Sequence, residues 1–121
     1  MNRKVVDITE IISLIPIGHE NAINLEKLTE EFEKRGWLDD CSPTTKSRVV
    51  RKMIERTGYE YVICNLQDGH GYFRPTADDL SSYKKWLNQE QARLEKISKR
   101  LKIGRALFED FLRERLKEQR I

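Results

Sequence analysis

The stretch that decides the fold is SPTTKSRVVRKMIERTG, residues 42–58, which has the pattern of a single basic helix. Its apolar residues recur at helical spacing and predict a buried face. These residues are Val49, Val50, Met53 and Ile54. Five bases and one acid, Glu55, occupy other positions, and Gly58 predicts the end of the helix. The stretch is either a solvated helix that happens to be basic or a helix that lies against a phosphate backbone.

The start of this basic helix has two candidate positions. Ser42 can cap a helix that has Pro43 in its first position, where the missing N–H would have no partner anyway. Thr44 or Thr45 can be the cap instead, which starts the helix a few residues later. The sequence leaves the two alternatives open.

Two helices are predicted before the basic stretch. Isoleucines at helical spacing predict the first over residues 7–15, with Asp7 and Glu10 as a capping-box-like pair. The second is predicted over residues 25–35, with Asn24 as its cap. Residues Leu25, Leu28 and Phe32 line one face of this second helix, and Gly36 closes it. Residues 20–40 hold seven acids and three bases, so an acidic region precedes the basic helix.

A β-hairpin is predicted after the basic helix. The segment YEYVIC, residues 59–64, alternates like a strand, and YFR, residues 72–74, is a second strand that Pro75 ends. NLQDGHG between them supplies glycines for the left-handed positions of a turn. Ala22–Ile23 can join the hairpin as a third strand.

Residues 76–121 contain no proline and a single glycine, Gly104, and are predicted to be helical. Thr76 and Asp79 make a capping-box-like start. Apolar residues then follow a heptad-like seam, at Leu80, Tyr83, Leu87, Leu94, Ile97, Leu101, Phe108 and Phe111. Because one helix cannot bury its own stripe, the seam predicts either a homodimer or a fold-back at Gly104. We favour the homodimer, held by Leu87, Leu94, Ile97, Leu101, Phe108 and Phe111.

The predicted order of elements is that of a mainly α (α+β) winged helix-turn-helix with a small β-hairpin wing and a long C-terminal helical extension. Residues 1–75 form the winged helix-turn-helix domain in this interpretation, and residues 76–121 form the extension. The basic helix would enter the major groove of double-stranded DNA, braced by the acidic helix.

Candidate DNA contacts follow from this placement. Arg48 and Arg51 are candidates for base edges, because a guanidinium can bind guanine bidentately, and Lys46 and Lys52 for phosphates. The full set is Thr44, Thr45, Lys46, Ser47, Arg48, Arg51, Lys52 and His70. His70 with Gln67 at the turn could equally be an ordinary loop tip. Tyr72 and Phe73 are expected to pack the hairpin onto the core. The basic run over 93–105 is either a second DNA surface or the outside of an amphipathic helix.

Three segments carry a resemblance to a known group of proteins. They are IISLIPIGHENAINLEKL (residues 11–28), VVRKMIE (residues 49–55) and GYFRPTADDLSSYKKWLNQEQARLEKI (residues 71–97). Together they resemble small winged-helix proteins encoded by phages and prophages of Gram-positive bacteria. The likeness covers residues 8–105, and the chain departs from it in a longer connector before the basic helix and in the helix after Gly104. It implies a DNA-binding protein that acts as a transcriptional regulator or a replication-origin-binding protein.

Other functional classes lack a signature. No P-loop, HExxH or catalytic-triad pattern occurs, so we expect no enzyme and no cofactor. Cys41 and Cys64 with His19 and His70 match no zinc spacing, so we expect two reduced thiols and no metal site. The absence of a signal-peptide pattern and of a membrane-length apolar run predicts a cytoplasmic protein. The resemblance to phage proteins implies that this cytoplasm is that of a bacterial host cell. The alternative to DNA binding is a module that binds a host or phage protein through its acidic region and its tail.

Overall fold

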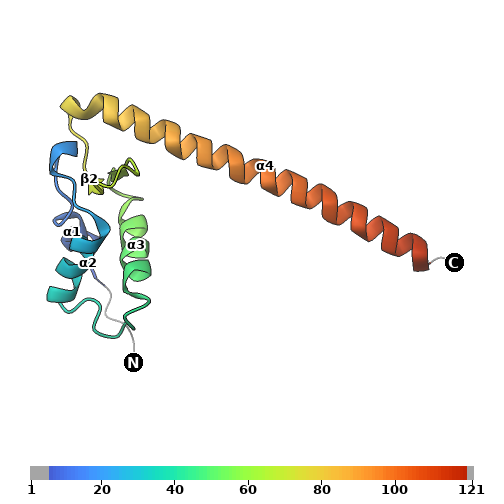
Figure 1. The fold of residues 1–121 in the computed structure, drawn as a ribbon, viewed down its shortest axis with the longest axis horizontal. Helices are drawn as coiled ribbons and strands as arrows, with labels where there is room; N and C mark the ends of the chain where they lie inside the picture. The colour runs from blue at the N-terminus through green and yellow to red at the C-terminus, as the bar shows by residue number, and fades with distance from the viewer. Residues whose placement is uncertain (1–5, 120–121) are drawn as a thin grey trace. The chain divides into compact units, whose positions relative to one another are not determined.

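The computed structural model describes residues 6–119 and is mainly helical, with one small antiparallel hairpin and a long C-terminal helix (Figure 1). Its elements are α1 (Ile8–Ile12), η1 (His19–Asn21), α2 (Leu25–Lys34), α3 (Lys46–Thr57), β1 (Cys64–Asn65), β2 (Tyr72–Phe73), η2 (Ala77–Asp79) and α4 (Leu80–Gln119). The chain divides into two compact units, Met1–Trp86 and Leu87–Ile121. The coarse fold expected from the sequence is thereby confirmed. Over the described range, no helix combines the length and apolar character that crossing a membrane requires.

The main core of the first unit lies between α1, α2 and α3, with α3 packed against both other helices. Ile11, Leu28, Phe32 and Val50 are fully buried there. The ring of Trp37, just after α2, meets the ring of Phe32 edge to face at 4.9 Å between centroids. Most of the apolar positions that the helical spacing predicted therefore lie in the core, whereas Leu25 and Met53 are partly buried against it.

The two helix caps predicted before α3 are confirmed. The Asp7 carboxylate accepts the N–H of Thr9 at 3.0 Å, and the Asn24 side chain accepts the N–H of Lys27 at 2.8 Å. α1 ends at Ile12, earlier than the predicted residue 15, because Pro16 follows closely and residues 13–15 continue as turns.

The basic helix begins at Lys46, which decides between the two candidate starts. The carbonyl of Ser42 accepts both the backbone N–H and the hydroxyl of Thr45, each at 3.0 Å, which closes a turn before the helix. Thr45 is the N-cap residue by position, although its side chain caps no backbone N–H. The start at Pro43 is therefore wrong, and Thr44 and Thr45 precede α3 rather than belong to it.

The hairpin is shorter than predicted. β1 pairs with β2 through Cys64 opposite Phe73 and Asn65 opposite Tyr72. The prediction of a strand over 59–64 is wrong for residues 59–63, which form turns and loop. The physical reason is that the Thr57 carbonyl accepts the backbone N–H groups of Glu60 and Tyr61, both at 3.1 Å. The helix end uses the donors that a longer strand would have given to the sheet.

The third strand is reduced to one bridge between Ile23 and Tyr72. The N–H of Ile23 donates to the carbonyl of Tyr72 at 3.0 Å, and the N–H of Tyr72 donates back at 2.8 Å. Gly71 makes this approach possible: a Cβ on it would lie 2.0 Å from the Ile23 carbonyl oxygen, and its φ is +100°. Glycine is required here for both space and backbone conformation.

The first turns of α4 belong to the first unit. The Asp79 carboxylate accepts the N–H and the hydroxyl of Thr76, both at 2.9 Å, which confirms the predicted capping pair. Tyr83 and Trp86 then pack against a second buried cluster at the hairpin. This cluster consists of Cys64, Leu66 and Phe73, so Phe73 packs as predicted. The contacts explain why the compact unit extends to Trp86.

α4 runs as one helix to Gln119 and spans about 60 Å at 1.5 Å per residue. It continues through Gly104, so the alternative of a fold-back at that residue is wrong. Gly104 has open space around its Cα, and a single glycine costs a helix only about 1 kcal/mol.

Candidate nucleic-acid interface

The outer face of α3 carries three exposed cations, Arg48, Arg51 and Lys52. Val49, Val50 and Ile54 on the opposite face are buried and fix the rotation of the helix. Within residues 6–119, the side chains of the three cations form no hydrogen bond or ion pair. They remain available to an external anion. We call them the α3 cation set.

The other predicted contacts on this segment already have partners in the chain. Lys46 forms an ion pair with Glu33 of α2, with 3.0 Å between Nζ and Oε1. The hydroxyls of Thr44 and Thr45 lie 3.3 Å and 3.0 Å from the Ser42 hydroxyl. These residues support the turn and the packing of α3 on α2. Ser47 is half-buried at the start of the helix.

Arg56 also differs from the α3 cation set. Its guanidinium donates a hydrogen bond to the backbone carbonyl of Val6, which ties the start of the described chain to α3. The one acid among these residues, Glu55, is exposed. Among the residues that the structure describes, three of the five bases placed here have no partner and two are engaged.

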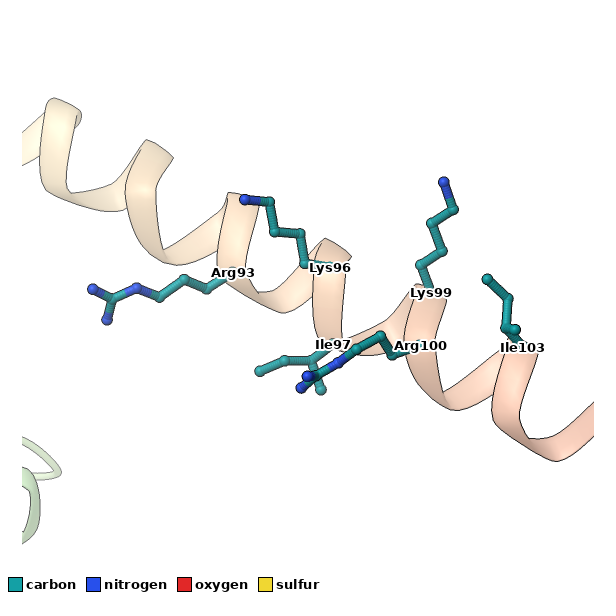
Figure 2. A pocket seen from close by; sticks show the side chains of 6 residues that line it. All are labelled: Arg93, Lys96, Ile97, Lys99, Arg100 and Ile103. Carbon is teal, nitrogen blue, oxygen red and sulfur yellow. The ribbon is translucent and has the colours of Figure 1, made fainter.

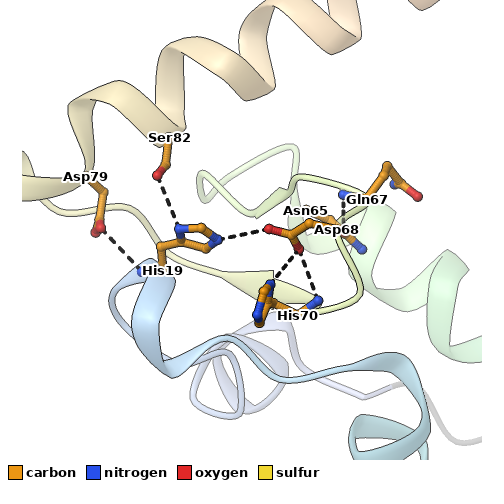
Figure 3. Close-up of polar contacts among 7 residues, drawn as sticks. All are labelled: His19, Asn65, Gln67, Asp68, His70, Asp79 and Ser82. Carbon is orange, nitrogen blue, oxygen red and sulfur yellow. Dashed lines mark hydrogen bonds and ion pairs between the residues drawn. The ribbon is translucent and has the colours of Figure 1, made fainter.

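His70 lies at the exposed tip of the hairpin, and Figure 3 shows it within a polar network. Its Nδ1 lies 3.2 Å from one oxygen of Asp68, and the other oxygen of Asp68 lies 3.2 Å from Nε2 of His19. The backbone N–H of His70 also donates to Asp68, and this bond is the main reason that the pKa of Asp68 falls to about 2. Asp68 is therefore charged at neutral pH and faces both histidines of the chain.

This network contains residues that the sequence did not single out for chemistry. The sequence pattern indicates only a turn at Asp68 and gives no signal for Ser82, whose hydroxyl lies 3.3 Å from Nδ1 of His19. His19 comes from η1 and Ser82 from α4, so residues far apart in the chain meet only after folding. The zinc combination weighed from the sequence also included the cysteines, but Cys64 is buried and neither cysteine is part of a disulfide.

Basic side chains of α4 surround apolar ones in the second unit. Figure 2 shows Arg93, Lys96, Lys99 and Arg100 around Ile97 and Ile103. Ile97 is 47% exposed and Ile103 is 50% exposed, so the basic residues do not cover them. The run over 93–105 thus presents charge and apolar area on one helix.

The predicted dimerisation residues are all exposed on α4. Leu94, Leu101 and Phe108 have exposed fractions of 59–60%, and Leu87, Ile97 and Phe111 are also exposed. Leu112 and Leu116 are further exposed apolar residues that the seam prediction omitted, although they lie at helical spacing from it. No described residue of this unit is buried. We call the exposed apolar residues at seam positions, from Leu87 to Phe111, the α4 stripe.

Comparison with known proteins gives a partial likeness to an error-prone DNA polymerase of Pseudomonas paraeruginosa. The two sequences are 35% identical over 63 residues, which is 50% of this chain and 6% of the polymerase. The chain therefore spans a small fraction of that relative. No protein-family profile matches the chain. No solved structure matches it.

Proposed function

We propose that this chain binds double-stranded DNA through the outer face of α3. The observation that carries the proposal is the α3 cation set: Arg48, Arg51 and Lys52 are exposed, share one face and lack internal partners among the described residues. A helix fits the major groove, which is about 12 Å wide, and a guanidinium can bind the O6 and N7 of guanine bidentately. Arg48 and Arg51 are the proposed base contacts, and Lys52 is the proposed phosphate contact.

We assign the fold to the winged helix-turn-helix class within this proposal. α2 and α3 form the helix pair, and the hairpin of β1 and β2 follows as the wing. In this class the second helix enters the groove and the first braces it. The Lys46–Glu33 ion pair and the packing of α3 on α2 are braces of this kind.

The resemblance to phage and prophage winged-helix proteins supports a role as a regulator or an origin-binding protein. The polymerase of Pseudomonas paraeruginosa is named for its action on DNA, and its likeness to this chain is limited to 63 residues. It adds little to the proposal, which depends on the surface of α3.

The α4 stripe supports a homodimer as the binding species. A helix of 40 residues with an exposed seam of leucines, isoleucine and phenylalanines gains stability when a second helix covers the seam. A two-fold dimer would place two α3 helices on the two half-sites of a palindromic operator.

Fluorescence anisotropy with a random-sequence duplex over a salt series tests the proposal. On a random sequence all three cations would contact phosphates, which predicts a log–log slope of about −3 per protomer. Arg48→Ala or Arg51→Ala should weaken specific binding by ~1–3 kcal/mol and relax base preference, whereas Lys52→Ala should weaken all sequences alike and flatten the slope by about 1. Lys117→Ala removes the same charge from the second unit, where Lys117 pairs with Glu114, and serves as the control.

The same experiment can reject the proposal. Wild-type affinity in all three variants of the α3 cation set would show that α3 is not the interface. A second candidate function is binding of another protein, favoured by the α4 stripe and by the exposed acids Glu26, Glu30 and Glu33 of α2. If the chain binds no DNA even at low salt, the DNA-binding proposal is rejected and protein binding becomes the favoured function.

A further inference from the structure

The side chains of His19, Asp68 and His70 converge outside the α3 surface (Figure 3). Each offers one ligand atom, and the three atoms lie within 4.8 Å of one another. The carboxylate is central: Asp68 presents one oxygen to each imidazole, at 3.2 Å in both cases. Both histidines of the chain are in this cluster.

We propose that His19, Asp68 and His70 bind a divalent transition-metal ion of the zinc type. Imidazole nitrogens and a carboxylate oxygen are ligands that Zn²⁺ accepts at about 2.0–2.2 Å. Tetrahedral bonds of that length place neighbouring donors about 3.3 Å apart. Either oxygen of Asp68 already lies 3.2 Å from one imidazole nitrogen and so meets this requirement on one side. The three ligand atoms lie within 4.8 Å of one another, so a bound ion needs a closer approach of the second imidazole to the same oxygen.

The surroundings orient the ligands before any ion binds. The Ser82 hydroxyl lies 3.3 Å from Nδ1 of His19, so the tautomer protonated at Nδ1 can donate to it and leave Nε2 free for a metal. The ring of Phe73 also packs against the ring of His19, with 4.9 Å between the ring centroids. The backbone N–H of His70 donates to Asp68 at 3.0 Å and fixes the carboxylate. Partners of this kind are typical of metal-binding histidines.

The exposure of the cluster determines what kind of metal site it can be. The side chains of His19 and Asp68 are 31% and 29% exposed, and His70 is 70% exposed. Three protein ligands at such a surface leave at least one coordination position to water or to an added anion. One oxygen and two nitrogens suit zinc, cobalt or nickel better than calcium or magnesium, which prefer all-oxygen ligand sets.

A bound ion would cross-link the hairpin tip, through Asp68 and His70, to His19 of η1. His19 and Asp68 are 49 residues apart in the chain, so an ion that joins them stabilises the folded state relative to the unfolded one. This consequence does not depend on the proposed DNA binding, because none of the three ligands lies on α3.

The test is a titration of the untagged, reduced full chain with Zn²⁺ by calorimetry and with Co²⁺ by visible absorption. We expect saturable binding of one ion per chain and a rise in the unfolding temperature with ion concentration. His70→Gln and Asp68→Asn should each weaken binding at least tenfold. His70 is exposed, so the first variant is expected to fold, and urea unfolding followed by tryptophan fluorescence checks this.

Asp78→Asn is the matched control for Asp68→Asn, because Asp78 is exposed in η2 and lies outside the cluster. It should bind the ion like wild type. Cys41→Ser excludes the partly exposed thiol as a ligand, and an intense thiolate-to-cobalt band would reveal one. The proposal is overturned if no one-to-one binding saturates, if His70→Gln binds like wild type, or if binding requires Cys41.

Discussion

α3 and α4 are both basic amphipathic helices, and they differ in what covers their apolar faces. Val50 and Ile54 of α3 are 0% and 5% exposed because α1 and α2 pack on them. Leu94 and Leu101 of α4 are 60% and 59% exposed in a unit without a buried residue among those described. The same sequence pattern therefore produces a core element in one place and an exposed surface in the other. A helical period identifies an apolar face and leaves its partner undetermined.

The largest expected effect is on the free energy of unfolding, and it should differ between a buried and an exposed phenylalanine. Phe32→Ala should lower the free energy of unfolding of the first unit by about 3–5 kcal/mol, because it opens a cavity beside Trp37. Phe108→Ala, with a side chain that is 60% exposed, should leave that transition unchanged. Urea unfolding followed by tryptophan fluorescence measures it, since Trp37 and Trp86 both belong to the first unit. Equal losses in the two variants would mean that the units unfold together.

Two glycines of the hairpin, Gly71 and Gly69, test whether close backbone packing adds to the cost of a left-handed conformation. Gly71→Ala should destabilise the first unit by roughly 1–3 kcal/mol, because it adds a clash with the Ile23 carbonyl to the cost of a left-handed alanine. Gly69 has a similar φ of +87°, but a Cβ added there would have no atom within 4 Å. Gly69→Ala should therefore destabilise the unit only by the cost of a left-handed alanine, about 1 kcal/mol. Hydrogen exchange at the N–H groups of Ile23 and Tyr72 should rise only in Gly71→Ala. Equal exchange in both variants would contradict a role for the close approach.

The α4 stripe predicts an effect that depends on protein concentration. Leu101→Asp lies on the proposed seam and should weaken self-association at least tenfold, or about 1.4 kcal/mol. Ile103→Asp adds the same charge at an exposed apolar residue that lies off the seam, and should change association less. Sedimentation equilibrium measures both. A wild-type chain that remains monomeric at high concentration would reject the homodimer.

The smallest expected effect concerns the cap of α1 and its dependence on pH. The N–H of Thr9 holds the pKa of Asp7 below its usual value of 3.8. The pKa of Asp7 is therefore lower in the folded chain than in the unfolded chain, and at a pH between the two the unfolded chain binds more protons. The stability that Asp7 contributes is thus lost as pH falls below about 4. Asp7→Asn keeps a capping oxygen without a titrating group and should remove this part of the acid sensitivity. Thermal unfolding from pH 6 to pH 2.5 compares the two, and parallel curves would contradict the assignment.

Much of the fold could be predicted because its signals are local. The caps at Asp7 and Asn24 and the apolar spacing of α3 each depend on residues within a few positions of one another. The errors occurred where two local signals competed. Residues 59–63 alternate like a strand, but the end of α3 already uses the backbone donors of residues 59–61. Ser42 and Pro43 form a plausible helix start, yet the Ser42 carbonyl closes a turn on Thr45 instead.

The candidate sites were predictable to a smaller extent. The exposure of Arg48, Arg51 and Lys52 follows from the helical period, since they lie opposite the buried valines. The engagement of Lys46 with Glu33 could not be predicted, because it depends on how α2 lies against α3. The His19–Asp68–His70 cluster was missed because its members match no ligand spacing along the chain.

The sequence by itself determined the helices, their apolar faces, the left-handed turn of the hairpin and the division of charge between the acidic and basic regions. These properties follow from backbone conformation and from the spacing of side chains along one element. Only the tertiary structure decided which cations of α3 remain free, which residues surround His19, and that Tyr83 and Trp86 pack on the hairpin while the α4 stripe stays exposed. These properties require contacts between residues distant in the chain, and local spacing does not encode such contacts.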